Sequence, residues 1–100
     1  MNCILRPADR ADLADIWAYG AQEWGVAQAD RYVTGIASRI GNAAGSPGIG
    51  SPVGGLPSTY RKLAFGSHRV VYRVSESDLI VVRILHFRQE VPDIFEDDRL

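Results

Sequence analysis

Arginine is the residue type that offers most for recognition chemistry in this chain. Four arginines fall on or beside two apolar segments of the second half: Arg69, Arg73, Arg83 and Arg88. A guanidinium group presents a fixed fork of donors that suits carboxylate and phosphate groups. These side chains either recognise an acidic partner or lie on a solvated sheet surface beside the acidic tail at 90–98. Because Arg69 and Arg83 are embedded among apolar residues, we expect both to be buried and paired.

The residues needed for common catalytic mechanisms are not grouped in the sequence. The glycines at 45–55 are interleaved with prolines and lack the lysine of a phosphate-binding loop. Cys3 is the only cysteine, and no His, Cys and Asp residues have metal-ligand spacing. Ser67 and His68 are adjacent in an extended segment, so their side chains should point to opposite faces. We therefore expect no metal, no cofactor, no catalytic residue and no enzymatic activity.

Length and charge favour a single intracellular domain, 1–100. The chain has 100 residues and a net charge of −1, which gives no sign of sequence-specific nucleic-acid binding. Pro7 interrupts the N-terminus before the apolar part of a signal peptide can form. No apolar run approaches the roughly 20 residues that cross a bilayer. The lone Cys3 is compatible with a reducing compartment, so we expect a cytoplasmic protein.

Two helices are predicted after a short first strand at 2–6. Pro7 favours a helix start, and a stripe of apolar residues at helical spacing runs to a stop at Gly25. The stripe consists of Leu13, Ile16, Trp17, Gly20 and Trp24. A second stripe begins at Ala29 and ends at the stop signals Gly41 and Asn42. Helices joined so tightly should form an antiparallel hairpin.

Three strands are predicted in the second half, after a glycine- and proline-rich loop at 43–58. They lie at 60–65, 68–74 and 79–85, and their connections are short enough for hairpins. The last strand is almost continuously apolar, so we expect it to be central and covered on one face by the helices. The order is β-α-α-β-β-β. This is an α+β fold in which a helix hairpin packs on a small, mainly antiparallel sheet.

Most of the chain resembles the ParE family of the RelE/ParE toxin–antitoxin superfamily. The resemblance is carried by YRKLAFGSHRVVYRV at 60–74 and IVVRILHFRQEVP at 80–92, and agrees with ADLADIWAYGAQEWG and AQADRYVTGI in the helices. It implies the RelE/ParE-like order of elements given above. It also implies a cytoplasmic toxin of a type II toxin–antitoxin system that blocks DNA gyrase. A ParD-like antitoxin, whose C-terminal segment folds against the toxin, would neutralise it.

RelE-like relatives of the same fold are ribosome-dependent messenger RNA endonucleases, and this is the main alternative. Three basic residues fit their active-site positions: Lys62, Arg69 and Arg88. Tyr60 stands where a further lysine is expected, and Ile94 and Phe95 stand where a tyrosine is expected. Metal-free RNA cleavage needs a group that transfers a proton, and the only nearby substitute is His86. A third alternative is a non-toxic module that only binds antitoxin.

Surface recognition of gyrase is therefore our prediction. The predicted target surface consists of Arg69, Arg83, His86, Phe87 and Arg88, together with the C-terminal residues. Large aromatic residues dominate interface energetics, so the predicted antitoxin surface consists of Trp17, Trp24 and Tyr32. Core packing is the alternative for both tryptophans. The prediction entails a hetero-oligomer with the antitoxin and no membrane association.

Overall fold

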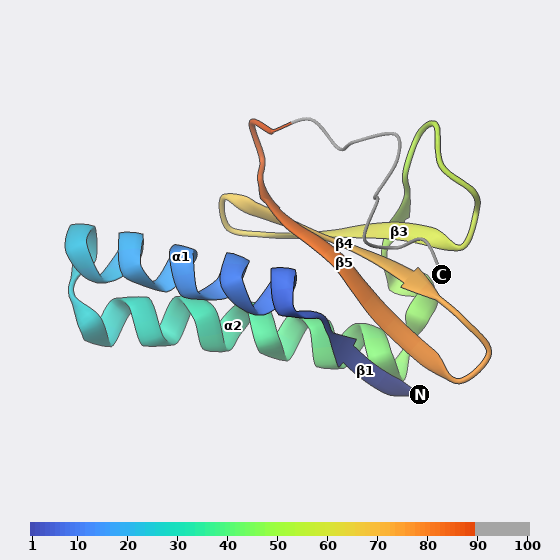
Figure 1. The fold of residues 1–100 in the computed structure, drawn as a ribbon, viewed down its shortest axis with the longest axis horizontal. Helices are drawn as coiled ribbons and strands as arrows, with labels where there is room; N and C mark the ends of the chain where they lie inside the picture. Colours follow the sequence, from blue (N-terminus) through green and yellow to red (C-terminus); the bar gives the residue numbers. More distant parts are fainter. Residues whose placement is uncertain (90–100) are drawn as a thin grey trace.

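Two antiparallel helices lie against one face of a five-stranded sheet in a computed structural model that describes residues 1–89 (Figure 1). The elements follow in the order β1 (Asn2–Leu5), α1 (Pro7–Trp24), α2 (Val26–Gly45), the 3₁₀ helix η1 (Pro47–Ile49), β2 (Ser51–Pro52), β3 (Tyr60–Phe65), β4 (His68–Val74) and β5 (Asp78–His86). This confirms the predicted α+β class and the predicted order of the main elements. None of the helices in this part of the chain has the length and apolarity that a bilayer crossing requires.

The helix hairpin turns at a single glycine. Gly25 has a φ of 91°, a conformation that glycine adopts without steric cost, and α2 begins at the next residue. The predicted end of α2 at Gly41 and Asn42 is wrong, because the helix continues to Gly45. Ala43 is fully buried in the last turn, so packing on the sheet maintains helical backbone beyond the local stop signals.

The sheet has the strand order β1-β5-β4-β3-β2. β1 runs parallel to β5, and every other neighbouring pair is antiparallel. β5 therefore has a neighbour on each side, as its apolar sequence predicted. The short strand β2 was not predicted, since it lies within the glycine-rich segment. The hydroxyl of Tyr72 helps to order this segment, because it donates to the Pro47 carbonyl at 2.6 Å and accepts from the Gly50 N–H at 3.1 Å.

Apolar side chains form two clusters on opposite faces of the sheet. The helix-side cluster consists of Ile36, Ile40, Ala43, Leu63, Val70, Tyr72, Leu79, Val81 and Ile84. The outer cluster consists of Val53, Val71, Val82 and Leu85. A β-bulge changes the phase of β5, because Val71 pairs with Arg83 whereas Tyr72 pairs with Val81. Val81 and Ile84 consequently both face the helices, although they are three residues apart.

Candidate functional site

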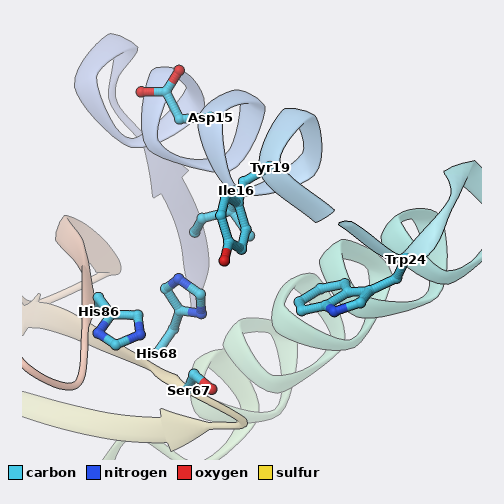
Figure 2. Close-up of a pocket in the computed structure, with 7 residues that line it drawn as sticks. All are labelled: Asp15, Ile16, Tyr19, Trp24, Ser67, His68 and His86. Atoms are coloured by element: carbon cyan, nitrogen blue, oxygen red, sulfur yellow. The ribbon is translucent and has the colours of Figure 1, made fainter. Parts of the chain in front are cut away.

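A groove of about 410 Å³ lies between α1 and the adjoining ends of β4 and β5 (Figure 2). Its lining residues are Asp15, Ile16, Tyr19, Trp24, Ser67, His68 and His86. A polar depression of about 210 Å³ continues from it and adds Asp12, Arg83, Ile84 and Gln89 to the lining. The volume of the groove falls within the range of about 300–1,000 Å³ that is typical of binding clefts.

The groove exists because the closed end of the helix hairpin extends beyond the strands (Figure 1). Leu13 and Ile16 of α1 are partly buried against the helix-side cluster, whereas the residues near the end of that helix are more exposed. Tyr19 is 61% exposed and Trp24 is 51% exposed. Exposed apolar side chains that gather in one patch are typical of binding surfaces.

Aromatic rings form a continuous run along the groove. Tyr19 packs edge-on against Trp24 at 6.2 Å between centroids, and Trp24 lies 5.8 Å from Tyr32. Tyr32 in turn contacts His68 at 5.6 Å, and His68 contacts His86 at 5.5 Å. Rings from both helices and from two strands therefore build one surface, and their mutual packing fixes its shape.

The Tyr32 hydroxyl connects α2 to the β3–β4 turn. It accepts a hydrogen bond from the Ser67 N–H at 3.0 Å, lies 3.2 Å from the Phe65 carbonyl oxygen and lies 2.7 Å from His68 Nδ1. Gly66 has a φ of 53°, and a Cβ there would lie 2.7 Å from the Tyr32 ring. Burial, and then the neighbouring His86, lower the pKa of His68, so this imidazole is neutral at neutral pH.

The end of β5 presents an exposed aromatic and a cation side by side. Phe87 is 53% exposed, and the guanidinium carbon of Arg88 lies 5.4 Å from its ring centroid. The ring of His86 lies 4.7 Å from the Phe87 ring, and its Nδ1 accepts from the Arg88 N–H at 3.2 Å. Arg69 stabilises the turn at residues 87–89, because its Nη2 donates to the Phe87 carbonyl at 3.3 Å and to the Gln89 carbonyl.

Arg83 is paired, as predicted, but it is not buried. Its Nε lies 3.1 Å from Asp12 Oδ2, and its side chain is 40% exposed. The bulge places Arg83 at the rim of the sheet, where α1 passes. The expectation that Arg69 is buried is also wrong, because this side chain is half-buried. Arg69 lies opposite Leu85 of the outer cluster in the strand register, so the two arginines lie on different faces of the sheet. Among the predicted target residues, the structure brings His86, Phe87 and Arg88 together and supports them through Arg69. Arg83 lies at their edge, in the polar depression that His86 also lines.

The three residues predicted to bind the antitoxin do not all lie at the groove. Trp24 lines the groove, and Tyr32 lies beneath it in contact with Trp24. Trp17 is 37% exposed and does not line the groove, since its Nε1 donates to Asp30 Oδ1 of α2 at 2.7 Å. Neither tryptophan is a core residue, which decides against that alternative.

Several lining residues were missed by the sequence analysis. Ile16 and Tyr19 are spaced by three residues and share a helix face, a signal that could have identified Tyr19. His68 and Ser67 enter the groove only because the β3–β4 turn folds beneath α2, which no local pattern indicates. In residues 1–89 no three His, Cys, Asp or Glu side chains are grouped as metal ligands would be. The acidic tail, Ile94 and Phe95 lie outside the described residues.

Comparisons with known proteins agree on one family. The family model described as the ParE toxin of the type II toxin–antitoxin system, parDE, matches residues 4–91. Toxin ParE1 of Mycobacterium tuberculosis (strain CDC 1551 / Oshkosh) is 42% identical over 89 residues, which cover 88% of this chain and 91% of that protein. Toxin ParE1 of Caulobacter vibrioides (strain ATCC 19089 / CIP 103742 / CB 15) is 44% identical over 77 residues, covering 77% and 79%.

A solved structure supports the fold. A chain of the chromosomal ParDE TA system from P. aeruginosa superposes with a TM-score of 0.75 at 20% identity, covering 86% of this chain and 95% of that one. The similarity to the two curated toxins spans most of each chain and is well above the level at which only a fold is shared. The chain therefore belongs to the ParE toxin family of type II toxin–antitoxin systems.

Proposed function

We propose that this toxin acts in the cytoplasm by binding and inhibiting DNA gyrase, without catalysis, and that a ParD-like antitoxin bound in the groove silences it. One observation carries the choice of gyrase inhibition over RNA cleavage. Lys62 and Arg69, two of the three basic residues that a metal-free ribonuclease site would combine, lie on the face of the sheet opposite His68 and His86. The ParDE complex of the structural neighbour supports the choice of antitoxin.

The separation follows from strand register. Lys62 pairs with Val71 of the outer cluster, and Arg69 lies two residues before Val71 on β4. Residues two apart on a strand share a face, so Lys62 and Arg69 both belong to the outer face. His68 contacts Tyr32 of α2 on the helix side, and His86 is its cross-strand partner. Of the three basic residues expected at a ribonuclease site, Arg88 alone lies beside a histidine, His86, so the full set needed for general acid–base cleavage is not brought together.

The target surface that we propose centres on Phe87 and Arg88. Aromatic residues and arginine are both enriched at protein interfaces relative to the rest of the surface. His86 flanks them, and Arg69 is a positioning residue because it binds the carbonyls of residues 87 and 89. Arg83 lies at the edge of this surface and is held by Asp12.

The antitoxin site that we propose is the groove, with Trp24 and Tyr32 as its principal contacts. Trp17 would contact a segment that continues along the outside of the hairpin, where its ring is exposed. Covering these rings removes apolar surface from water, at about 25 cal/mol per Å², partly offset by ordering of the bound segment. The toxin should therefore melt at a higher temperature when the C-terminal peptide of the antitoxin is added in excess.

The decisive experiment adds purified toxin to a gyrase supercoiling assay and, separately, to ribosomes translating messenger RNA. We expect supercoiling to fall and the messenger RNA to remain intact. Arg88→Ala should abolish inhibition while leaving the melting temperature and antitoxin affinity unchanged. Arg10→Ala is the matched control, because Arg10 is an exposed arginine of α1 that is distant in sequence from this surface.

Three outcomes would argue against the proposal. Cleavage of messenger RNA with no effect on gyrase would favour the ribonuclease alternative. A folded Arg88→Ala variant with full inhibition would remove Arg88 from the target surface. If wild-type toxin binds antitoxin but affects neither assay, the chain is a binding module only.

A further inference from the structure

We infer that the groove is built for an amphipathic antitoxin segment that carries a lysine or arginine opposite Asp15, which makes Asp15 a specificity-determining residue for partner choice. The inference rests on the proposed function, because it takes the antitoxin to be the occupant. It adds the chemistry that the occupant must have.

Asp15 is the unpaired charge of the groove. It is exposed on α1 and makes no hydrogen bond or ion pair within residues 1–89. Its neighbour Asp12 is compensated by Arg83 at 3.1 Å. His68 is neutral at neutral pH, because burial and the adjacent His86 lower its pKa. The groove and the depression beside it therefore carry one uncompensated carboxylate and no uncompensated arginine or lysine.

The rest of the groove wall is apolar and selects an apolar partner surface. Ile16 and Tyr19 follow Asp15 along α1, and Trp24 extends the same wall. Figure 2 shows the Tyr19 side chain extending from α1 toward His68, whereas the Asp15 carboxylate is directed away from both histidines. A segment that fills the wall must pass this carboxylate. Covering a carboxylate without a counter-charge costs part of its hydration, so a cation on the segment at this position is favoured.

The exposed position of Asp15 defines how it acts. Exposed charges at the edge of an interface change association rate, salt dependence and partner discrimination more than they change the lifetime of the complex. A favourable exposed pair changes affinity by about two- to fivefold, and placing like charges opposite each other reverses the effect. Asp15 should therefore favour antitoxins with a basic residue at the matching position and oppose those with an acidic one.

The test measures association rate and affinity of the co-encoded antitoxin for the full-length toxin at low and high salt. Asp15→Asn should slow association by about threefold at low salt and flatten its salt dependence. Asp15→Lys should slow it by about tenfold or more. Glu23→Lys is the matched control, because it makes the same charge change on an exposed position of α1 that does not line the groove. It should associate almost as fast as wild type.

A charge exchange then identifies the partner residue. Each lysine and arginine of the antitoxin is changed singly to glutamate, and one of these variants should restore binding to Asp15→Lys while binding wild-type toxin poorly. The inference is overturned if Asp15→Lys behaves like Glu23→Lys, or if no antitoxin variant couples to it. The Trp24→Ala variant distinguishes an error in the role of Asp15 from an error in the proposal that the groove binds the antitoxin. If antitoxin affinity survives Trp24→Ala, the groove is not the antitoxin site at all.

Discussion

Asp12 connects α1 to two groups of β5 through a single oxygen. Its Oδ2 lies 3.1 Å from Arg83 Nε and accepts a hydrogen bond from the Ile84 N–H at 3.2 Å. Removing the arginine leaves the carboxylate with its backbone donor. Removing the carboxylate deprives both the Arg83 guanidinium and the Ile84 N–H of this acceptor. We therefore predict that Asp12→Ala lowers the free energy of unfolding more than Arg83→Ala does.

The magnitudes follow from exposure. The Arg83 side chain is 40% exposed, so solvent screens the pair and its loss should cost about 0.2–1 kcal/mol. That is well below the roughly 3–5 kcal/mol for breaking a buried pair. Asp12→Ala also removes the acceptor of the Ile84 N–H, a group in a residue only 4% exposed, at a further cost of about 1–3 kcal/mol. Asp12→Asn retains an oxygen acceptor and should cost no more than Arg83→Ala.

Urea unfolding followed by circular dichroism tests this order. Thermal melting gives a second measure, because 1 kcal/mol corresponds to about 4–8 °C in a domain of this size. The double variant reports the coupling of the pair, which should stay below about 1 kcal/mol. The reasoning is refuted if Arg83→Ala costs as much as Asp12→Ala, or if Asp12→Asn is as damaging as Asp12→Ala.

Two further predictions concern α2 and the histidine pair. Gly41→Ala should raise the free energy of unfolding by about 0.5–1 kcal/mol, because a Cβ there meets open space. Gly35→Ala should lower the free energy of unfolding, because its Cβ would lie 2.3 Å from the Phe65 ring. The melting temperatures of both variants test the two directions. The pKa of His68 is lower in the folded state than in the unfolded chain. Below a pH of about 6.5 the unfolded chain therefore binds more protons, and the free energy of unfolding should decrease as the pH is lowered through this range. His68→Gln should weaken this dependence, and an unchanged pH profile would contradict the assignment.

Local sequence patterns predicted the main helices and strands, but they did not predict which distant segments pack together. The spacing of apolar residues and the position of Gly25 defined the hairpin, because these signals act within a few residues. The last turn of α2 escaped prediction because the burial of Ala43 is a tertiary effect. The parallel pairing of β1 with β5 and the short strand β2 likewise depend on contacts between distant segments.

The site was predicted only where a residue type carries its own signal. Trp24 and Tyr32 were chosen as large aromatics, and they meet at the groove. The bulge in β5 splits the predicted basic surface, and the alternation of residues in the sequence does not reveal this bulge. Arg83 thereby reaches Asp12, while Arg69 remains on the outer face. Whether these surfaces bind antitoxin and gyrase stays a prediction.

The parallel strand β1 has a consequence for how the protein is made. Among the strands of residues 1–89, β1 at residues 2–5 pairs with β5 alone, at residues 78–81, so the first of these strands to be synthesised is joined to the last. At about 5–20 residues per second, translation separates the two strands by several seconds. During that interval the hairpin exists without the sheet that covers Ile36 and Ile40. A partner already present at the translating ribosome would meet this apolar face before the sheet does, so we expect the timing of synthesis, as well as affinity, to influence capture of the nascent chain.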